Sequence, residues 1–303
     1  MTQIKRAIGE SMRISDEVMT HAGRFHADDV FSAALLKIVK PEVKVKRVMH
    51  VPEDFDGIAF DIGGGRYDHH QKGAEVRESG YAYAAFGLLW RDLGPKLVGR
   101  EMAEKFDKRF VEPLDINDTT GAYHPLARVI GNMNPIWDEE ADIDVCFERA
   151  VALAKVILED EFRVIAGIQR ANHIVEEALE KNSNHGVLIL DRGLPWKEPV
   201  VAHKDIDYVV YPSERGGYNG QVVERREADS EEATGLYFPE QWAGESAENL
   251  RKMTGVEDFN FCHAGRFLIS ASTLESALKL CEMSKKIAKE EGNASDTEIE
   301  TKR

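Results

Sequence analysis

The ten-residue run from Asp61 to His70 most constrains what this chain can fold into. It holds two carboxylates, two imidazoles and three glycines, and it directly follows the short apolar run 58–60. A buried strand that ends at Asp61 and turns through glycines would bring His69 and His70 back beside that carboxylate. This arrangement favours a metal-centred phosphate site.

Further potential ligands lie upstream, where a short strand over residues 17–21 is expected to end at His21. His26 follows, and Asp28 begins an expected helix that stops before a proline. In open α/β sheets, ligands bind beyond the carboxyl ends of the strands. We therefore expect these residues to lie beside Asp61.

The ligand types indicate which metal is bound. Imidazoles and carboxylates without a thiolate suit Mn²⁺ or a similar divalent cation better than a structural zinc. Asp115 and Asp118, near the end of a predicted helix, are further candidates. A bridging carboxylate can hold two metals roughly 3.5–4 Å apart, close enough to activate water and clamp a phosphoryl group. Taken singly, each of these residues is more simply a cap, turn or surface group, but their joint occurrence favours a dinuclear centre.

Composition describes an ordinary soluble protein of 303 residues, with 43% hydrophobic and 31% charged residues. No apolar stretch approaches the ~18 residues of a membrane span, and the N-terminus lacks the apolar core of a secretory signal. The three cysteines form no paired motif, so we expect a cytoplasmic location. A net charge of −15 argues against bulk coating of nucleic acid and weakly favours short or small phosphate substrates.

Hydrophobic periodicity predicts an α/β protein of two domains. Residues 1–182 would form a metal-binding domain with a doubly wound parallel sheet followed by a helical region. Residues 186–290 would form a smaller α/β domain, with the active site in the cleft between the two, and residues 291–303 a disordered tail. The expected strands of the smaller domain are 187–190, 200–203, 208–211, 221–224 and 260–262, before a helix over about 273–289.

These motifs resemble the DHH phosphoesterase superfamily, named for the triplet Asp68-His69-His70. Within it, the chain looks most like the melanocyte-proliferating-gene exonuclease family, long described as predicted metal-dependent hydrolases. The resemblance spans nearly the whole chain and rests on the segments 20–29, 61–64, 66–71, 216–219, 238–244 and 261–267.

The resemblance implies a role for each metal-site residue. One metal would be held by His21, His26 and Asp61, and the other by Asp28, Asp61, His69 and Asp115. His70 would face the phosphate or the leaving oxygen, and Asp68 would orient a ligating imidazole. Two departures matter: position 29 is Asp where the family usually has Glu, and the helical motif around Asp115 and Asp118 differs, which leaves the choice between those two open.

The second domain supplies substrate recognition in the superfamily, which implies that His263 and Arg266 contact the substrate. They belong to the pentapeptide His-Ala-Gly-Arg-Phe, which occurs at 21–25 and again at 263–267. Its second copy follows a predicted strand, and a turn there, with Gly265, can offer backbone N–H groups to a phosphate. Gly217 and Tyr218 form either a substrate-facing loop or a hairpin turn.

The predicted activity is that of an Mn²⁺-dependent phosphodiesterase with two metal ions, although Mg²⁺ or another divalent cation also fits. A hydroxide held between the metals would attack phosphorus. The family resemblance implies a 3′-to-5′ exonuclease acting on RNA or short oligonucleotides. Alternatives are hydrolysis of a cyclic dinucleotide, phosphoadenosine phosphate or pyrophosphate, and a non-catalytic metal- or nucleotide-binding role. We expect no membrane partner, and a homo-oligomer is left open.

Overall fold

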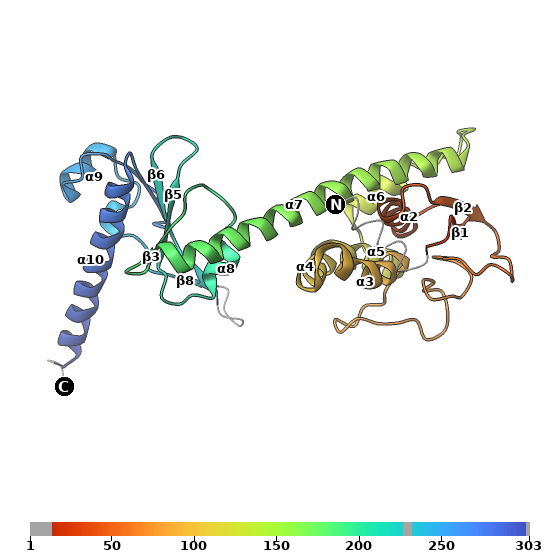
Figure 1. Cartoon of the computed structure of the whole chain (residues 1–303), viewed down its shortest axis with the longest axis horizontal. Coiled ribbons are helices and arrows are strands. Elements are labelled where there is room, and N and C mark those ends of the chain that lie inside the picture. The colour runs from red at the N-terminus through yellow and green to blue at the C-terminus, as the bar shows by residue number, and fades with distance from the viewer. Residues whose placement is uncertain (1–13, 227–231, 301–303) are drawn as a thin grey trace. The chain divides into compact units, whose positions relative to one another are not determined.

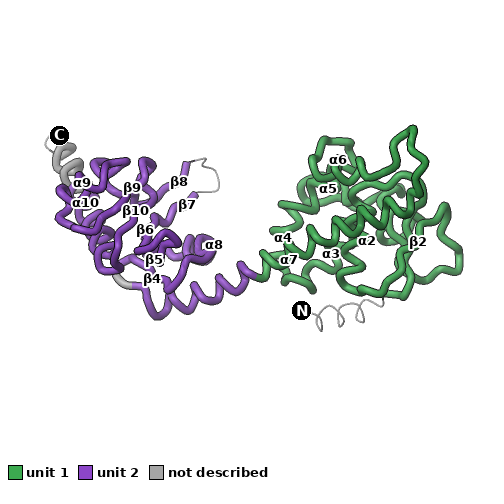
Figure 2. The backbone as a smooth tube through the Cα atoms, turned by 90° about the horizontal axis from the view of Figure 1, so that it is seen from above, with its two compact units in different colours: residues 1–166 green, residues 167–303 purple. Residues whose placement is uncertain are grey.

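The computed structural model describes residues 14–226 and 232–300. The chain divides into two compact units, residues 1–166 and 167–303 (Figure 2). The division falls within the long helix α7 (Ile143–Asn182), whereas the sequence predicted a boundary near the end of this helix. Helices and β-sheets occur together, so the predicted α/β class is confirmed. Within the described residues, no helix is both long and apolar enough to cross a membrane.

The first unit begins with a parallel β–α–β element (Figure 1). Strand β1 (Glu17–His21) pairs in parallel with β2 (Lys44–Val48), and α2 (Ala27–Val39) connects them. Single-residue parallel bridges join β1 to Ala59 and Phe60 to Tyr67. The described β-structure of this unit is therefore narrow, and the wider doubly wound sheet and interdomain cleft stay predictions.

Helices complete the first unit: α3 (Ala85–Val98), α4 (Arg100–Phe106), a π-helical turn η1 (Asp107–Val111), α5 (Glu112–Thr120) and α6 (Pro125–Gly131). Helix α3 continues through Pro95 to Val98 and ends at Gly99, whose φ of 80° no other residue adopts easily. Phe31 of α2 packs against Phe86 of α3, with ring centroids 5.5 Å apart. This apolar packing fixes α2 and α3 beside each other.

The second unit is built on a six-stranded sheet in the order β3-β4-β5-β6-β10-β9. The strands are β3 (Ser183–Asn184), β4 (Val187–Ile189), β5 (Tyr208–Pro212), β6 (Tyr218–Val222), β9 (Phe259–Cys262) and β10 (Leu268–Ala271). Among the described strands of this sheet, only β4 and β5 pair in parallel. A small two-stranded sheet, β7 (Arg225–Arg226) with β8 (Ala233–Thr234), and two short helices, η2 (Glu240–Trp242) and α9 (Ala247–Thr254), lie between β6 and β9 in sequence.

One face of this sheet packs against α10 (Leu274–Glu300). Tyr208, Val222 and Ile269 from three strands form a buried cluster with Leu280 and Cys281 of α10. The opposite face contacts the C-terminal part of α7 and the short helix α8 (Lys197–Val201) through a second buried cluster.

Two predictions about the second unit differ from the structure. Val200 and Val201 end α8 and do not form the predicted strand over 200–203. The two valines suggested a strand, but Trp196, buried in the second cluster beside Val200, favours a helical turn here. The predicted tail from residue 291 continues as helix to Glu300, and residues 301–303 lie outside the described part.

Candidate metal centre

Asp61 adopts a rare backbone conformation at the turn that follows the bridge residue Phe60. Its φ is 58°, in the left-handed region that costs most residues energy and that Asp tolerates better than bulky residues. The Asp61 amide donates to the carbonyl of Tyr67 at 2.9 Å, which closes the glycine loop behind it. Asp61 is 5% exposed. Strain at a buried carboxylate is typical of a functional position.

Asp68 holds the same loop together from inside. Its Oδ2 accepts from the Gly64 amide at 2.7 Å, and its Oδ1 accepts from the His70 amide at 3.0 Å. The His70 Nδ1 also lies 3.0 Å from Oδ1. Burial raises the pKa of Asp68, but the hydrogen bonds from His70 and Gly64 outweigh burial and leave the pKa below its usual value. Asp68 therefore stays ionised and orients His70.

The start of α2 brings two buried carboxylates to the end of β1. Asp28 and Asp29 occupy its first turn, where the helix dipole favours negative charge. The Asp29 Oδ1 accepts from the His26 amide at 2.8 Å and so caps the helix. The His21 Nδ1 lies 3.0 Å from the Ala22 carbonyl, while Nε2 lies 3.2 Å from both Asp29 Oδ2 and Asp61 Oδ2. A proton on Nδ1 leaves Nε2 free to bind a metal.

Helix α5 carries Asp118, one of the two aspartates between which the sequence left the choice of ligand open. Asp118 Oδ2 lies 3.1 Å from the Nε2 of His69. Burial raises the pKa of Asp118, but hydrogen bonds with His69 and Asp28 outweigh burial and lower the pKa below its usual value. The sequence signal for Asp118 was its place just before a helix-ending glycine, three residues after Asp115.

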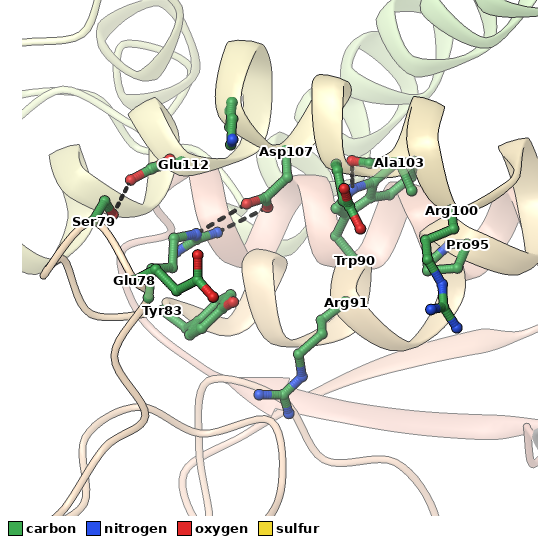
Figure 3. A pocket seen from close by; sticks show the side chains of 13 residues that line it. Glu78, Ser79, Tyr83, Trp90, Arg91, Pro95, Arg100, Ala103, Asp107 and Glu112 are labelled. Carbon is green, nitrogen blue, oxygen red and sulfur yellow. Dashed lines mark hydrogen bonds and ion pairs between the residues drawn. The ribbon is translucent and has the colours of Figure 1, made fainter.

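Asp115 pairs with Arg77 instead of joining His69. The Arg77 guanidinium lies 2.7 Å from Asp115. It also forms two hydrogen bonds, of 3.1 and 3.0 Å, with Asp107, which is labelled in Figure 3. A Cβ at Gly87 would overlap the Asp115 carboxylate, so only glycine fits there. Burial raises the pKa of Asp115 to about 7, although Arg77 opposes the rise. The structure therefore places Asp115 in a buried ion pair and does not group it with the other predicted ligands.

Three overlapping sets of side chains place ligand atoms within 4.8 Å of one another: Asp61, Asp68, His69 and His70; His21, His26 and Asp61; and His26, Asp28 and Asp118. Asp61 belongs to the first two sets and His26 to the last two. The Oδ1 atoms of Asp28 and Asp61 and the Nδ1 of His69 are buried without a hydrogen-bond partner in the described structure. Such atoms are costly unless a cation binds them, so these residues fit a metal.

The centre carries more negative charge than its own cationic groups offset. Burial, with the charges of Asp61 and Asp118, raises the pKa of Asp28 well above its usual value. Burial also raises the pKa of Asp29, which its hydrogen bond to His21 only partly offsets. Hydrogen bonds to Asp29 and Asp61 raise the pKa of His21 to about 10. Each shift favours a bound proton, and a divalent cation would supply the same positive charge.

This charge balance predicts that the pH dependence of stability differs between the metal-free and the Mn²⁺-bound protein. In the metal-free protein, Asp28 and Asp29 hold protons at pH values where the unfolded carboxyls, with pKa about 4, have lost them. His21 likewise keeps its proton from its unfolded pKa near 6.5 up to about 10. The folded state binds more protons in each case, so the free energy of unfolding falls as pH rises between about 5 and 9.

Saturating Mn²⁺ displaces those protons, so the protein should gain the most stability at the alkaline end of this range. At a hundredfold excess over Kd the gain is about 2.7 kcal/mol. Melting temperatures in EDTA and in Mn²⁺ at about pH 5, 7 and 9 test this expectation. Parallel pH profiles with and without Mn²⁺ would contradict it.

The predicted substrate residues lie in the second unit. His263 and Gly265 lie in the β9–β10 turn, where the Gly265 amide donates to the His263 Nδ1 at 2.9 Å. Arg266, with φ of 59°, lies over the Tyr237 ring at 5.8 Å.

Gly217 and Tyr218 occupy the turn into β6. Tyr218 packs against the buried α10-side cluster, and a Cβ at Gly217 would overlap the Ala271 carbonyl. These contacts favour the hairpin-turn interpretation of the pair.

Comparisons with known proteins agree over most of the chain. A family model described as "Uncharacterised protein family (UPF0160)", with the short name MYG1 exonuclease, matches residues 17–284. MYG1 protein YER156C of Saccharomyces cerevisiae is 24% identical over 341 residues, which cover 94% of this chain and 99% of that protein. MYG1 exonuclease of Rattus norvegicus is 27% identical, covering 86% and 82%, and that of Homo sapiens is 27% identical, covering 86% and 83%.

No solved structure matches the chain. The family match covers both units and contains every residue of the three ligand sets. The predicted family is thereby confirmed: this chain belongs to the MYG1 exonuclease family.

Proposed function

We propose that this chain is a divalent-metal-dependent phosphodiesterase that acts as a 3′-to-5′ exonuclease on RNA or short oligonucleotides. The observation that carries the proposal is the overlap of three ligand sets through Asp61 and His26. Each of the three sets contains a buried ligand atom without a hydrogen-bond partner in the described structure. A centre with shared ligands suits two cations, and Mn²⁺ matches its imidazole and carboxylate donors.

The ligand roles are assigned as the family resemblance implies, with one change. Asp61 would bridge two cations, with His21 and His26 on one side and Asp28, His69 and Asp118 on the other. Asp118 takes the place predicted for Asp115, because Asp115 already neutralises Arg77. Bound cations would supply Lewis-acid activation of a water and offset charge on the phosphoryl oxygens.

His70 is suited to contact the substrate. Its side chain is 62% exposed, whereas that of His69 is 10% exposed. Asp68 holds the His70 Nδ1, which leaves Nε2 to hydrogen bond a phosphate oxygen or the leaving oxygen. A cavity of about 680 Å³, lined by His70, Gln71 and Asn117 among others, lies beside the ligand sets and provides room for a nucleotide.

The relatives support the substrate class, since the rat and human proteins are named MYG1 exonuclease. Hydrolysis of a small phosphate compound would use the same centre with a different cavity occupant. All three cysteines are free, which fits the predicted cytoplasmic location.

Turnover assays test the proposal. The protein with Mn²⁺ is expected to shorten labelled single-stranded RNA or DNA from its 3′ end, releasing mononucleotides, and Asp118→Asn should lower kcat/KM more than Asp115→Asn does. Cyclic dinucleotides, phosphoadenosine phosphate and pyrophosphate serve as parallel substrates, and preferential hydrolysis of one of these would replace the exonuclease assignment. Full metal occupancy without any turnover would support a binding role instead.

A further inference from the structure

Half of the sheet face opposite α10 has no hydrophobic cluster over it in the described part of the second unit. The cluster on that face joins α7 and α8 to β4 and β5, through Leu188 and Val209. Alternation along β6 directs Tyr218 and Val222 to the α10 side. Asn219 and Gln221 of β6 therefore point to the opposite side. Their cross-strand partners on β10, Ser270 and Leu268, point to that side too.

A cavity of about 1120 Å³ occupies this place, within residues 168–270 of the second unit. We call it the sheet pocket. The strands line it with the polar side chains of Asn219, Gln221 and Ser270. Its aromatic lining consists of Trp196, Tyr211, Phe261 and His263, and helix α7 contributes Ile168 and Asn172.

The polar groups of the sheet pocket are held in fixed orientations. The Tyr211 hydroxyl donates to the Gln221 Oε1 at 2.7 Å, so the Gln221 Nε2 donor is turned away from that bond. The His263 Nδ1 accepts from the Gly265 amide, which places the ring proton of neutral His263 on Nε2. The Asn172 Oδ1 is buried without a hydrogen-bond partner among the described residues. Two oriented donors and one unused acceptor thus belong to one cavity.

Phe261 provides an aromatic surface at the edge strand β9. It is 43% exposed, whereas Phe238 and Phe259 of the same unit are completely buried. Its ring lies 6.2 Å from that of His263. An exposed ring beside oriented amide and imidazole groups is the combination that unpaired bases require, since bases stack on aromatic rings and hydrogen bond through their edges.

The charges lining the sheet pocket argue against a ligand recognised by phosphate alone. Lys197 and Arg215 are matched by Glu198 and Glu214, so there is no excess of cationic side chains. Phosphate-driven binding depends on such an excess. Base stacking and hydrogen bonding to base edges do not need excess cationic charge, so they remain effective in a chain of net charge −15.

We propose that the sheet pocket binds unpaired nucleobases of a single-stranded oligonucleotide, with Phe261 as the stacking platform and Gln221, His263 and Asn172 contacting base edges. The proposal rests on the proposed function for the identity of the ligand. It adds a site in the second unit, built from residues that belong to none of the metal-ligand sets, that would select single strands over duplexes.

Binding of labelled oligonucleotides of about ten nucleotides to the full chain in EDTA, followed by fluorescence anisotropy, tests the proposal without hydrolysis. Oligo(A) as RNA and as DNA should both bind, and a duplex of the same length should bind more weakly. Phe261→Ala should raise Kd about tenfold, which is the loss of one stacked base, whereas Phe261→Tyr keeps the ring and the affinity. Gln221→Glu keeps the acceptor for Tyr211, removes the Nε2 donor and should also weaken binding.

Met253→Ala is the matched control, because Met253 is 45% exposed in the same unit but does not line the sheet pocket. Equal affinities for the wild type, Phe261→Ala and Gln221→Glu would overturn the proposal, as would equal affinity for the duplex.

Two further measurements separate this proposal from the proposed function. Hydrolysis of bis(p-nitrophenyl) phosphate by the wild type with Mn²⁺ reports on the metal centre, whereas anisotropy of the wild type and Phe261→Ala in EDTA reports on the sheet pocket. If the wild type hydrolyses no phosphodiester yet Phe261-dependent binding is present, the proposed function fails and the sheet pocket stands. If hydrolysis occurs but Phe261 does not affect binding, the sheet-pocket proposal fails alone.

Discussion

Replacing Asp61 by asparagine is expected to abolish both metal binding and turnover. Asp61 belongs to two ligand sets at once, and its Oδ1 is buried without a hydrogen-bond partner in the described structure. The amide keeps the size of the side chain but removes the charge that would hold two cations together. A loss of at least about a thousandfold in kcat/KM, or ~4 kcal/mol, is expected.

Asparagine is a better test than alanine because of the backbone conformation at position 61. The φ of 58° at Asp61 is tolerated by asparagine, whereas alanine would add strain to the loss of the ligand. The folded variant should therefore keep its melting temperature in EDTA. Mn²⁺ titration calorimetry and turnover of labelled RNA measure the two losses.

Asp54→Asn is the control, since Asp54 is exposed in the same unit and belongs to none of the ligand sets. It should change neither affinity nor rate. Wild-type Mn²⁺ affinity in Asp61→Asn would remove Asp61 from the bridging role, and wild-type turnover would contradict the mechanism.

Replacing Arg77 by alanine is expected to cost about 3–5 kcal/mol of unfolding free energy. Arg77 is 7% exposed and pairs with two carboxylates, one of which, Asp115, is completely buried. Its guanidinium also lies 3.9 Å from the Tyr83 ring centroid, in the cavity of Figure 3. Removing it leaves Asp115 without its counter-charge in a buried position.

The cost should be larger at pH 8 than at pH 5, because Asp115, with a pKa of about 7, is mostly neutral at the lower pH. Urea unfolding at both pH values measures it. Arg109→Ala is the matched control: Arg109 is 58% exposed, pairs with Glu161 and should cost less than about 1 kcal/mol. Similar costs for the two variants would show that the buried pair does not stabilise the fold as proposed.

Loss of Arg77 should also weaken Mn²⁺ binding. Asp115 and Asp118 lie on neighbouring positions of α5, and Arg77 links this helix to Asp107 at the start of the π-helical turn. The ion pair between Arg77 and Asp115 would then fix the position of α5, and with it the contact between Asp118 and His69.

Most residues of the candidate metal centre could be singled out from the sequence because their signals are local. His21 ends a strand, Asp28 begins the next helix, and Asp61 follows another β residue; the structure brings all three near one another. Strand ends along one edge of a sheet converge whatever the rest of the fold does. The choice between Asp115 and Asp118 was not predictable, since residues three apart on a helix share a face and only Arg77, distant in sequence, distinguishes them.

The two copies of the pentapeptide His-Ala-Gly-Arg-Phe separate what the sequence determined from what only the tertiary structure decided. By itself, the sequence determined the family, the α/β class and the residue types of a metal centre, because these follow from motifs and local periodicity. It could not assign the two copies of the pentapeptide. His21 lies beside Asp29 and Asp61, whereas His263 lies in a hairpin turn at the sheet pocket. Neighbours brought close by folding set the charge and the hydrogen bonds around each imidazole, so only the tertiary structure decided what each one can bind.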